Sequence, residues 1–485
     1  MLEGFVRRFS PLEILTEAEV DAIWHGILDV LENVGLKFYE EIPRATEIFA
    51  KSGCSVDYES QLVKFPRDLV TDCLSRCPTS FTLRAREPDN DIVVRGDRLY
   101  VQPGPGNQYL DLDSYEPRNP TRKEFYEAVT VYDALPNLHF LHPNSPNTSF
   151  EDITPAMAPL ESLVARLRNS TKANMSGSAG GDHEFRIGIA KAAGTNLLWA
   201  GGASSPLGWS GDRINGFMAA IEAGFPLSIA SGASWGASSP STIAGSVVSN
   251  SAEVMGPLIL AQLMHPEYPV SVRLFSFPLN MRNGSLFFGN IATALGNAAF
   301  FQVWRRYNIP TTSVEPAISN SKCMDFQSGY EKGILALVAA ISGAHTLWLH
   351  GTVYGQLTAH PVQAIMDDDI SGMLGRFLEG VNVNEETLAI ELIKQVGSGP
   401  DFYLDKEHTR KWWRNEQFIP IVAEMSTLPE WLARGKKASI DLAKEKMAEI
   451  IATHKVSVPL TDSQEEEITR ILAEAEKFHR DRGKL

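Results

Sequence analysis

The chain has 485 residues, of which 44% are hydrophobic and 21% are charged, a composition typical of a globular protein. Its 44 basic and 59 acidic residues give a formal net charge of −15. An acidic protein repels phosphate backbones and anionic lipids, so we expect neither nucleic acid nor a membrane as a partner. Four cysteines are too few for a disulfide scaffold, and we expect reduced thiols in a cytoplasmic protein.

Residues 1–95 are predicted to form a helical N-terminal layer. Thr16 and Glu19 have the spacing of a capping box, and a periodic apolar run from Ile23 to Val34 follows them. The first twenty residues lack the continuous apolar core of a signal peptide. The apolar run at 333–344 is too short to cross a bilayer. We therefore expect a cytoplasmic location.

Residues 96–380 are predicted to form a barrel. Short apolar segments, each followed by a helical pattern, begin at Leu99, His139, Lys172, Leu197, Leu227, Val270, Thr311 and His345. Such strand–helix units without a break predict an α/β fold, a closed (β/α)₈ TIM barrel. An open doubly wound sheet is the alternative, but no GxGxxG motif follows the first segment. Residues 381–485 are predicted to be a helical C-terminal extension packed on the barrel.

The candidate site lies at the carboxyl ends of the predicted strands, where barrels of this kind place their active sites. Alternation of side chains along a strand points Arg273, Phe275 and Phe277 into the barrel, with Glu315 close enough to pair with Arg273. A ring-lined, water-poor cavity suits a quaternary ammonium, which cannot donate a hydrogen bond and is held by aromatic faces. The candidate ring residues are Tyr109, Trp235, Phe275, Phe277, Trp348 and Tyr354, although each ring could equally be ordinary core.

Other motifs of catalysis are missing from the sequence. There is no HExxH, Walker A or GxSxG motif. The run Asp367-Asp368-Asp369 lies on the predicted helix after the last strand, and we expect it to face solvent. His142 and His350 are candidates for the barrel mouth, or else buried polar residues without a role in binding.

Five segments of the chain resemble the trimethylamine methyltransferase superfamily. They are residues 241–254, 280–284, 321–333, 339–351 and 396–413. The resemblance covers nearly the whole chain, and it implies methyl transfer from a methylamine to the Co(I) of a corrinoid (cobalamin). A separate small corrinoid-binding protein carries that cofactor. The resemblance also implies a homo-oligomer, and no tightly bound cofactor or metal is expected in the chain itself.

One departure from the superfamily indicates the subgroup. The trimethylamine enzymes contain pyrrolysine, whereas this chain contains only standard residues, so it resembles the non-pyrrolysine branch, whose characterised members demethylate quaternary amines such as glycine betaine. A quaternary nitrogen leaves as a neutral amine without a general acid. The residues predicted to bind a substrate carboxylate are His350 first, then Arg282, Asn174 and His142. Carnitine, proline betaine and γ-butyrobetaine are alternative substrates, and a barrel hydrolase or lyase and a non-catalytic betaine binder are alternative functions.

Overall fold

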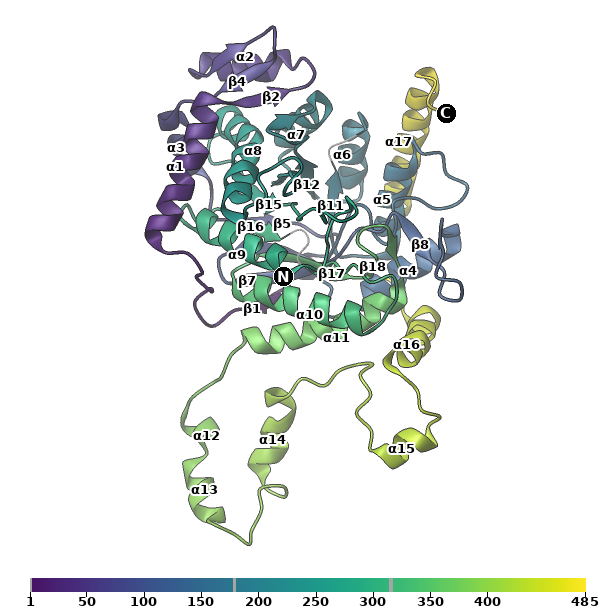
Figure 1. Ribbon diagram of the computed structural model, residues 1–485. Coiled ribbons are helices and arrows are strands. Elements are labelled where there is room, and N and C mark those ends of the chain that lie inside the picture. The colour runs from purple at the N-terminus through teal and green to yellow at the C-terminus, as the bar shows by residue number, and fades with distance from the viewer. Residues whose placement is uncertain (1, 178–179, 314–316) are drawn as a thin grey trace.

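The protein, described by a computed structural model over residues 2–177, 180–313 and 317–485, is built on a closed parallel barrel (Figure 1). The sheet runs in the order β7-β17-β16-β15-β14-β12-β11-β10, with parallel pairing throughout. The backbone N–H of His139 donates to the carbonyl of Val101 at 2.7 Å, which joins the last strand to the first. The prediction of a (β/α)₈ barrel is confirmed. The barrel strands are β7 (Arg98–Pro103), β10 (Phe140–Leu141), β11 (Ala173–Gly177), β12 (Leu197–Gly202), β14 (Leu227–Ala230), β15 (Val270–Leu274), β16 (Thr311–Ser313) and β17 (Thr346–His350).

Each predicted helix of the outer layer is present. Helix α4 begins with a capping box formed by Thr121 and Glu124, and α8 is long and apolar enough to cross a membrane by length and composition alone. However, 72% of its most apolar window is buried inside the fold, as in the core helix of a globular protein. The layer consists of α4 (Arg122–Ala134), α5 (Ala158–Asn169), α6 (His183–Ala192), α7 (Gly211–Ala223), α8 (Ile243–Met264), α9 (Ile291–Arg305), α10 (Phe326–Ile341) and α11 (Pro361–Leu378).

The N-terminal layer is not wholly helical, so that part of the prediction is wrong. It contains α1 (Glu17–Asn33), α2 (Pro43–Lys51) and α3 (Arg67–Arg76), but also the strands β2 (Leu36–Phe38), β3 (Ser55–Asp57), β4 (Leu62–Lys64), β5 (Ser80–Leu83) and β6 (Ile92–Arg95). Strands of three or four residues are too short to show an alternating pattern. The β5–β6 hairpin packs on Tyr100, Phe140 and Met175 and so covers the amino end of the barrel.

Short strands complete the loops around the barrel. Strand β1 (Phe5–Val6) pairs with β7 in antiparallel orientation, and β13 (Gly208–Trp209) joins the sheet of β2. The loops above the barrel carry a second small sheet made of β8 (Gln108–Leu110), β9 (Pro117–Arg118), β18 (Thr352–Val353) and β19 (Thr358–Ala359), and a 3₁₀ turn, η1, spans Pro88–Asn90. The four cysteines are free thiols, and burial raises the pKa of Cys77 to about 12.

The C-terminal extension packs on the barrel only in part, which differs from the prediction for residues 381–485. Helix α16 (Ser439–Thr453) packs against α11 and α4, and α17 (Asp462–Asp481) packs against α6. Between α11 and α16 the chain forms an arm that extends away from the barrel in Figure 1. Three of its four helices bury no residue, because no other described part of the chain covers their apolar side chains. The arm contains α12 (Glu385–Leu388), α13 (Ile390–Val396), α14 (Glu407–Glu416) and α15 (Leu428–Ala433).

The acidic run on α11 is buried, so the prediction that it faces solvent is wrong. Asp367 and Asp368 are fully buried and Asp369 is 8% exposed. The Asp369 carboxylate accepts hydrogen bonds from the backbone N–H groups of Val422 and Ala423 at 3.0 and 3.1 Å. The loop of the arm between α14 and α15 therefore covers the side of α11 that was expected to face water.

Candidate active site

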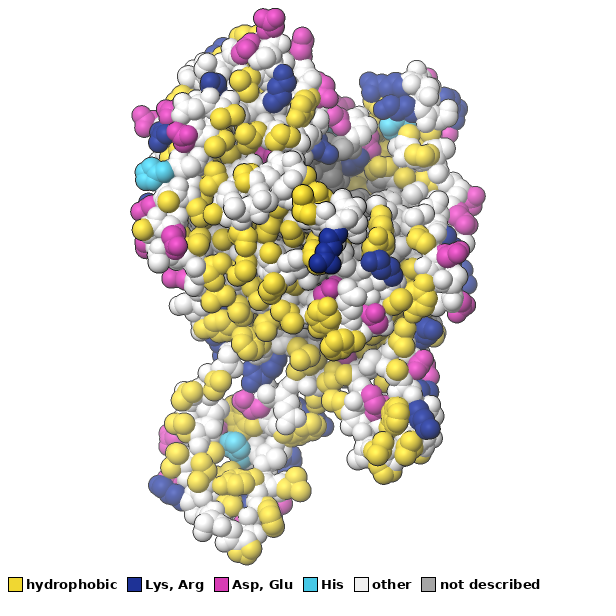
Figure 2. All heavy atoms as spheres, viewed as in Figure 1, with side chains coloured by type: hydrophobic (Ala, Val, Ile, Leu, Met, Phe, Trp, Pro, Cys, Tyr) yellow, Lys and Arg dark blue, Asp and Glu magenta, His cyan; other side chains and the backbone are white. Residues whose placement is uncertain are grey.

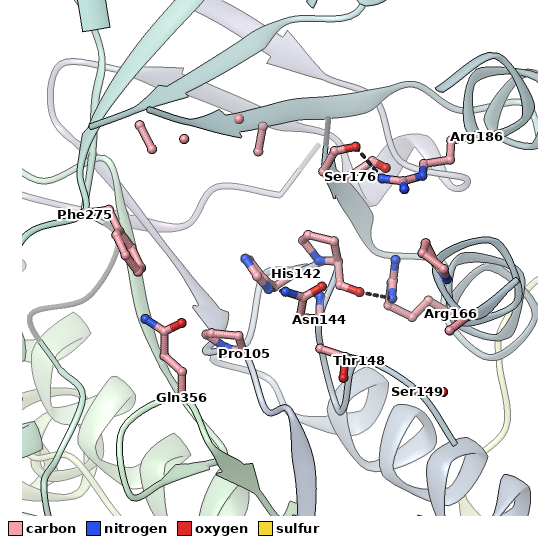
Figure 3. A pocket seen from close by; sticks show the side chains of 18 of the residues that line it. Pro105, His142, Asn144, Thr148, Ser149, Arg166, Ser176, Arg186, Phe275 and Gln356 are labelled. Atoms are coloured by element: carbon pink, nitrogen blue, oxygen red, sulfur yellow. Dashed lines mark hydrogen bonds between the residues drawn. The ribbon is translucent and has the colours of Figure 1, made fainter. Parts of the chain in front are cut away.

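A cavity of about 830 Å³ opens at the carboxyl ends of the barrel strands (Figure 3). Its floor is formed by the last residues of β11, β12 and β14, where Gly177, Gly202 and Ala230 present little or no side chain. Because parallel strands end on the same rim, this floor lies where a (β/α)₈ barrel places its active site. The small residues leave the volume above them open to a ligand.

Aromatic rings form one side of the cavity, which we call the ring side and define by Phe275 and Trp348. Both residues line the cavity, and Trp348 is 4% exposed. The Trp348 ring meets the ring of His142 edge to face, with centroids 4.4 Å apart. Phe277 does not line the cavity: its ring centroid is 5.9 Å from that of Phe275, and it belongs to the same apolar cluster as Trp348. The ring side is therefore supported by a second apolar layer.

Arginines form the opposite side of the cavity, which we call the arginine side, and Figure 3 shows two of them across from Phe275. Arg166 on α5 donates from Nε to Oδ1 of Asn174 at 3.2 Å and from Nη1 to the carbonyl of Pro143 at 2.7 Å. Arg186 on α6 pairs with Asp182 at 2.6 Å. The arginine side consists of Arg166, Arg186, Arg213 and Arg273.

The other two arginines come from the neighbouring units of the barrel. Arg213 on α7 donates from Nη1 to the carbonyl of Gly202 at 2.6 Å and to Oγ of Ser204 at 3.1 Å. Arg273 on β15 has its Nη1 3.8 Å from the sulfur of Met175. The predicted partner of Arg273, Glu315, lies outside the described residues. Arg273 and Phe275 are two residues apart and therefore point to the same face, and both line the cavity, as alternation predicts.

Burial lowers the pKa of His142, which lies between the two sides, and that of Arg166 on the arginine side. It holds the pKa of His142 well below the ordinary value for histidine, and the charges of Arg273 and Arg166 lower it further. Nδ1 of His142 accepts the backbone N–H of Asn144 at 3.2 Å, so the proton of the neutral ring is assigned to Nε2. Burial first, and then the charge of Arg186, lower the pKa of Arg166 to about 9, which still leaves it cationic at neutral pH.

Three of the ten predicted site residues line this cavity: His142, Phe275 and Trp348. The other predicted rings contact groups of the protein itself. Tyr109 packs on His360 and lies under the guanidinium of Arg118, and Lys322 lies 4.3 Å from the ring centroid of Tyr354. The indole of Trp235 donates to Ser276 at 2.6 Å, and Phe277 is in the layer behind the ring side.

The structure also separates the predicted carboxylate-binding residues from one another. His350 does not line the cavity: it is fully buried, with Nε2 3.2 Å from a carboxylate oxygen of Asp368 on α11. A bulge between Trp348 and His350 breaks the alternation of β17, so the inward position expected for His350 is wrong. Arg282 is exposed in a loop, and Asn174 is buried beneath Arg166, where it accepts the bond described above.

Sequence reasoning missed the three arginines that come from helices, because charged helical residues are ordinarily assigned to solvent. One signal was available for Arg166. It lies three residues after Leu163 and next to Leu167, both buried, and therefore on the apolar stripe of its helix. In the parts of the chain that the structure describes, no group of three His, Cys, Asp or Glu side chains could hold a metal ion.

The fold is a (β/α)₈ barrel, and its cavity at the carboxyl ends of the strands has the volume of a small-molecule site. The chain belongs to the trimethylamine methyltransferase (MTTB) family, whose profile matches residues 1–477. The resemblance seen in the sequence is therefore confirmed, and with it the class of methylamine and betaine methyltransferases.

Individual relatives agree over most of the chain. It is 30% identical to a glycine betaine methyltransferase of Desulfitobacterium hafniense (strain Y51), covering 91% of this chain and 92% of the relative. It is 28% identical to a trimethylamine methyltransferase MttB of D. hafniense (strain DSM 10664 / DCB-2), covering 93% and 91%. Among solved structures, the monomethylamine methyltransferase of Methanosarcina barkeri aligns with a TM-score of 0.48 and 12% identity, covering 96% and 92%.

Proposed function

We propose that this chain transfers a methyl group from a quaternary amine to the Co(I) of a corrinoid carried by a separate small protein. Glycine betaine is the leading substrate, and dimethylglycine is the product. The observation that carries the proposal is the ring side, where Phe275 and Trp348 stand beside a neutral His142. The 30% identity to a glycine betaine methyltransferase supports the same substrate. Carnitine, proline betaine and γ-butyrobetaine are the alternatives.

The proposed reaction requires no proton transfer by the protein. The methyl C–N bond breaks with its electron pair left on nitrogen, and the electron pair of Co(I) forms the new bond to carbon, so the amine leaves neutral and no proton moves. A neutral His142 is consistent with this requirement. The ring side holds the ammonium and presents one methyl group to the open end of the cavity. A cavity of about 830 Å³ leaves room beyond a small betaine for the acceptor to approach.

The proposal is tested with purified protein, Co(I) cobalamin or a corrinoid protein, and a panel of methylated amines. We expect the visible spectrum to change from Co(I) to methyl-Co(III) with glycine betaine and to change little with trimethylamine. No methyl-Co(III) with any quaternary amine would contradict the proposal. Binding of betaine without methyl transfer would identify a non-catalytic binder, and cleavage of another substrate a hydrolase or lyase.

In the same assay, Trp348→Leu is expected to lower kcat/KM for glycine betaine by about 2- to 30-fold, because one ring over a cation contributes about 0.5–2 kcal/mol. Trp348→Phe, which keeps a ring, should retain more activity than the leucine variant. Trp413→Leu is the control, since Trp413 lies on α14 in the arm. Equal activity of the leucine variant and the unmodified protein would show that Trp348 does not bind the substrate.

We also propose a homo-oligomer. Figure 2 shows hydrophobic side chains gathered over the face that carries α10 and over the arm below it. Sedimentation of the purified protein should give a mass above that of one chain, and a monomer would contradict this proposal. Separately, we propose that the protein is located in the cytoplasm. The most exposed of the apolar residues on α10, α11 and the arm are Phe326, Val381, Val383, Phe402 and Leu404.

A further inference from the structure

Arg166 is a buried cation without an anionic partner among the described residues. It is 1% exposed, and its two hydrogen bonds go to neutral acceptors, the amide oxygen of Asn174 and the carbonyl of Pro143. These contacts use Nε and Nη1, and Nη2 forms no hydrogen bond with any residue that the structure describes. A buried guanidinium is stable in a protein when an anion compensates its charge. The missing anion indicates a ligand.

The surroundings of Arg166 strengthen this inference. Arg213 contacts only backbone carbonyls and the hydroxyl of Ser204 in the described chain, so it too lacks a carboxylate. By contrast, Arg186 is paired with Asp182. Uncompensated positive charge in a cavity of low dielectric attracts an anion and repels a ligand that carries only positive charge. Glu151 and Asp152 also line the cavity, but both are exposed to solvent. A negative group on the ligand would therefore compensate the charge of Arg166 and Arg213.

The orientation of Arg166 is fixed by β11. The Asn174 side chain donates from Nδ2 to the carbonyl of Lys172 at 2.9 Å, which leaves Oδ1 to accept from Nε of Arg166 at 3.2 Å. Because a guanidinium is planar, fixing Nε and Nη1 also fixes the direction of Nη2. Asn174 is thus a positioning residue, and its burial at 1% exposure agrees with that role.

We propose that Arg166 binds the carboxylate of the substrate, so that the enzyme selects zwitterionic quaternary amines over purely cationic ones. This inference rests on the proposed function. The ammonium lies against Phe275 and Trp348, and the carboxylate reaches Arg166 across the cavity. His142 stands between the two sides: its ring meets Trp348, and the charge of Arg166 acts on it (Figure 3). Arg166 thus takes the role that the sequence analysis gave to His350.

The test compares glycine betaine with choline, which has the same trimethylammonium head and a hydroxyl in place of the carboxylate. Calorimetry measures the binding of each compound without any corrinoid. Arg166→Gln is expected to weaken glycine betaine binding by about ten- to hundredfold, as for loss of a charged hydrogen bond, and to leave choline binding unchanged or stronger. Arg166→Lys keeps the positive charge but loses the planar set of N–H donors of the guanidinium. It should therefore weaken betaine binding less than Arg166→Gln does.

Arg168→Gln is the matched control. It lies on the same helix and removes the same charge, but Arg168 pairs with Glu465 of α17 outside the cavity, so the ratio of betaine to choline affinity should not change. Equal loss for both ligands in Arg166→Gln, or no loss for betaine, overturns the inference. If Arg166→Gln does not fold, the same ratio in Arg166→Lys decides, and an unchanged ratio overturns it.

The failure of this inference and the failure of the proposed function are distinguishable. If the protein transfers methyl from betaine but Arg166→Gln leaves the ratio of betaine to choline affinity unchanged, the proposed function stands. The role of Arg166 is then overturned. Betaine binding that depends on Arg166 without methyl transfer supports the carboxylate site and overturns the function. A protein that binds no betaine contradicts both.

Discussion

Replacing Asp367 by alanine is expected to lower the free energy of unfolding by about 3–5 kcal/mol, because it leaves a buried charge without its partner. Asp367 and Lys332 are both fully buried, and the ammonium of Lys332 lies 2.7 Å from the carboxylate. The same carboxylate accepts the backbone N–H of Gly351 at 2.9 Å and the side-chain amide of Gln363 at 2.8 Å. Burial lowers the pKa of Lys332, and the charge of Asp367 opposes that shift.

Urea unfolding of the variant measures this loss, followed by circular dichroism. The double variant Asp367→Leu with Lys332→Met removes both charges and should recover part of the stability lost in Asp367→Ala. Glu379→Gln at the end of the same helix is the control, since its side chain is 56% exposed and we expect a change within about 0.5 kcal/mol. A loss below 1 kcal/mol in Asp367→Ala would show that the pair is not a structural anchor.

The barrel could be predicted from the sequence because each strand is a short apolar segment that ends in small or polar residues before a helix. The N-terminal strands could not be predicted, since β2 and β3 have three residues each. The run Asp367–Asp369 was assigned to solvent because three adjacent charges usually face water. Here each carboxylate accepts hydrogen bonds from a different partner, and those partners come from segments that are distant in the sequence.

The candidate site was predictable only where one strand supplied the residue and its alternation was unbroken. This holds for Phe275 on the segment after β15 and for Trp348 on β17. One residue beyond Leu349 the bulge of β17 turns His350 toward α11, and no local pattern signals a bulge. The arginine side was not predictable as a set, because its members come from three helices and a strand that meet only in the closed barrel.

Acid is expected to destabilise the protein steeply below pH 6.5, because several histidines are buried in the neutral form. Burial lowers the pKa of His139 and His360 to about 3 and that of His345 to about 4. In the unfolded chain these residues take up protons near pH 6.5, whereas the folded protein does not. The stability that the neutral rings contribute is therefore complete above pH 6.5 and is lost as the pH falls toward 4.

Each such histidine contributes a slope of about 1.4 kcal/mol per pH unit in this window. Urea unfolding at pH 7.0, 6.0 and 5.0 measures the slope. His360→Asn is the sharpest variant, because His360 caps α11 by accepting the N–H of Val362, and asparagine can cap a helix without titrating. We expect His360→Asn to reduce the slope of unfolding free energy against pH by the contribution of one histidine, about 1.4 kcal/mol per pH unit. The matching replacement of His25, which is exposed on α1, should leave the slope unchanged. An equal slope in His360→Asn and the unmodified protein would show that acid acts through other groups.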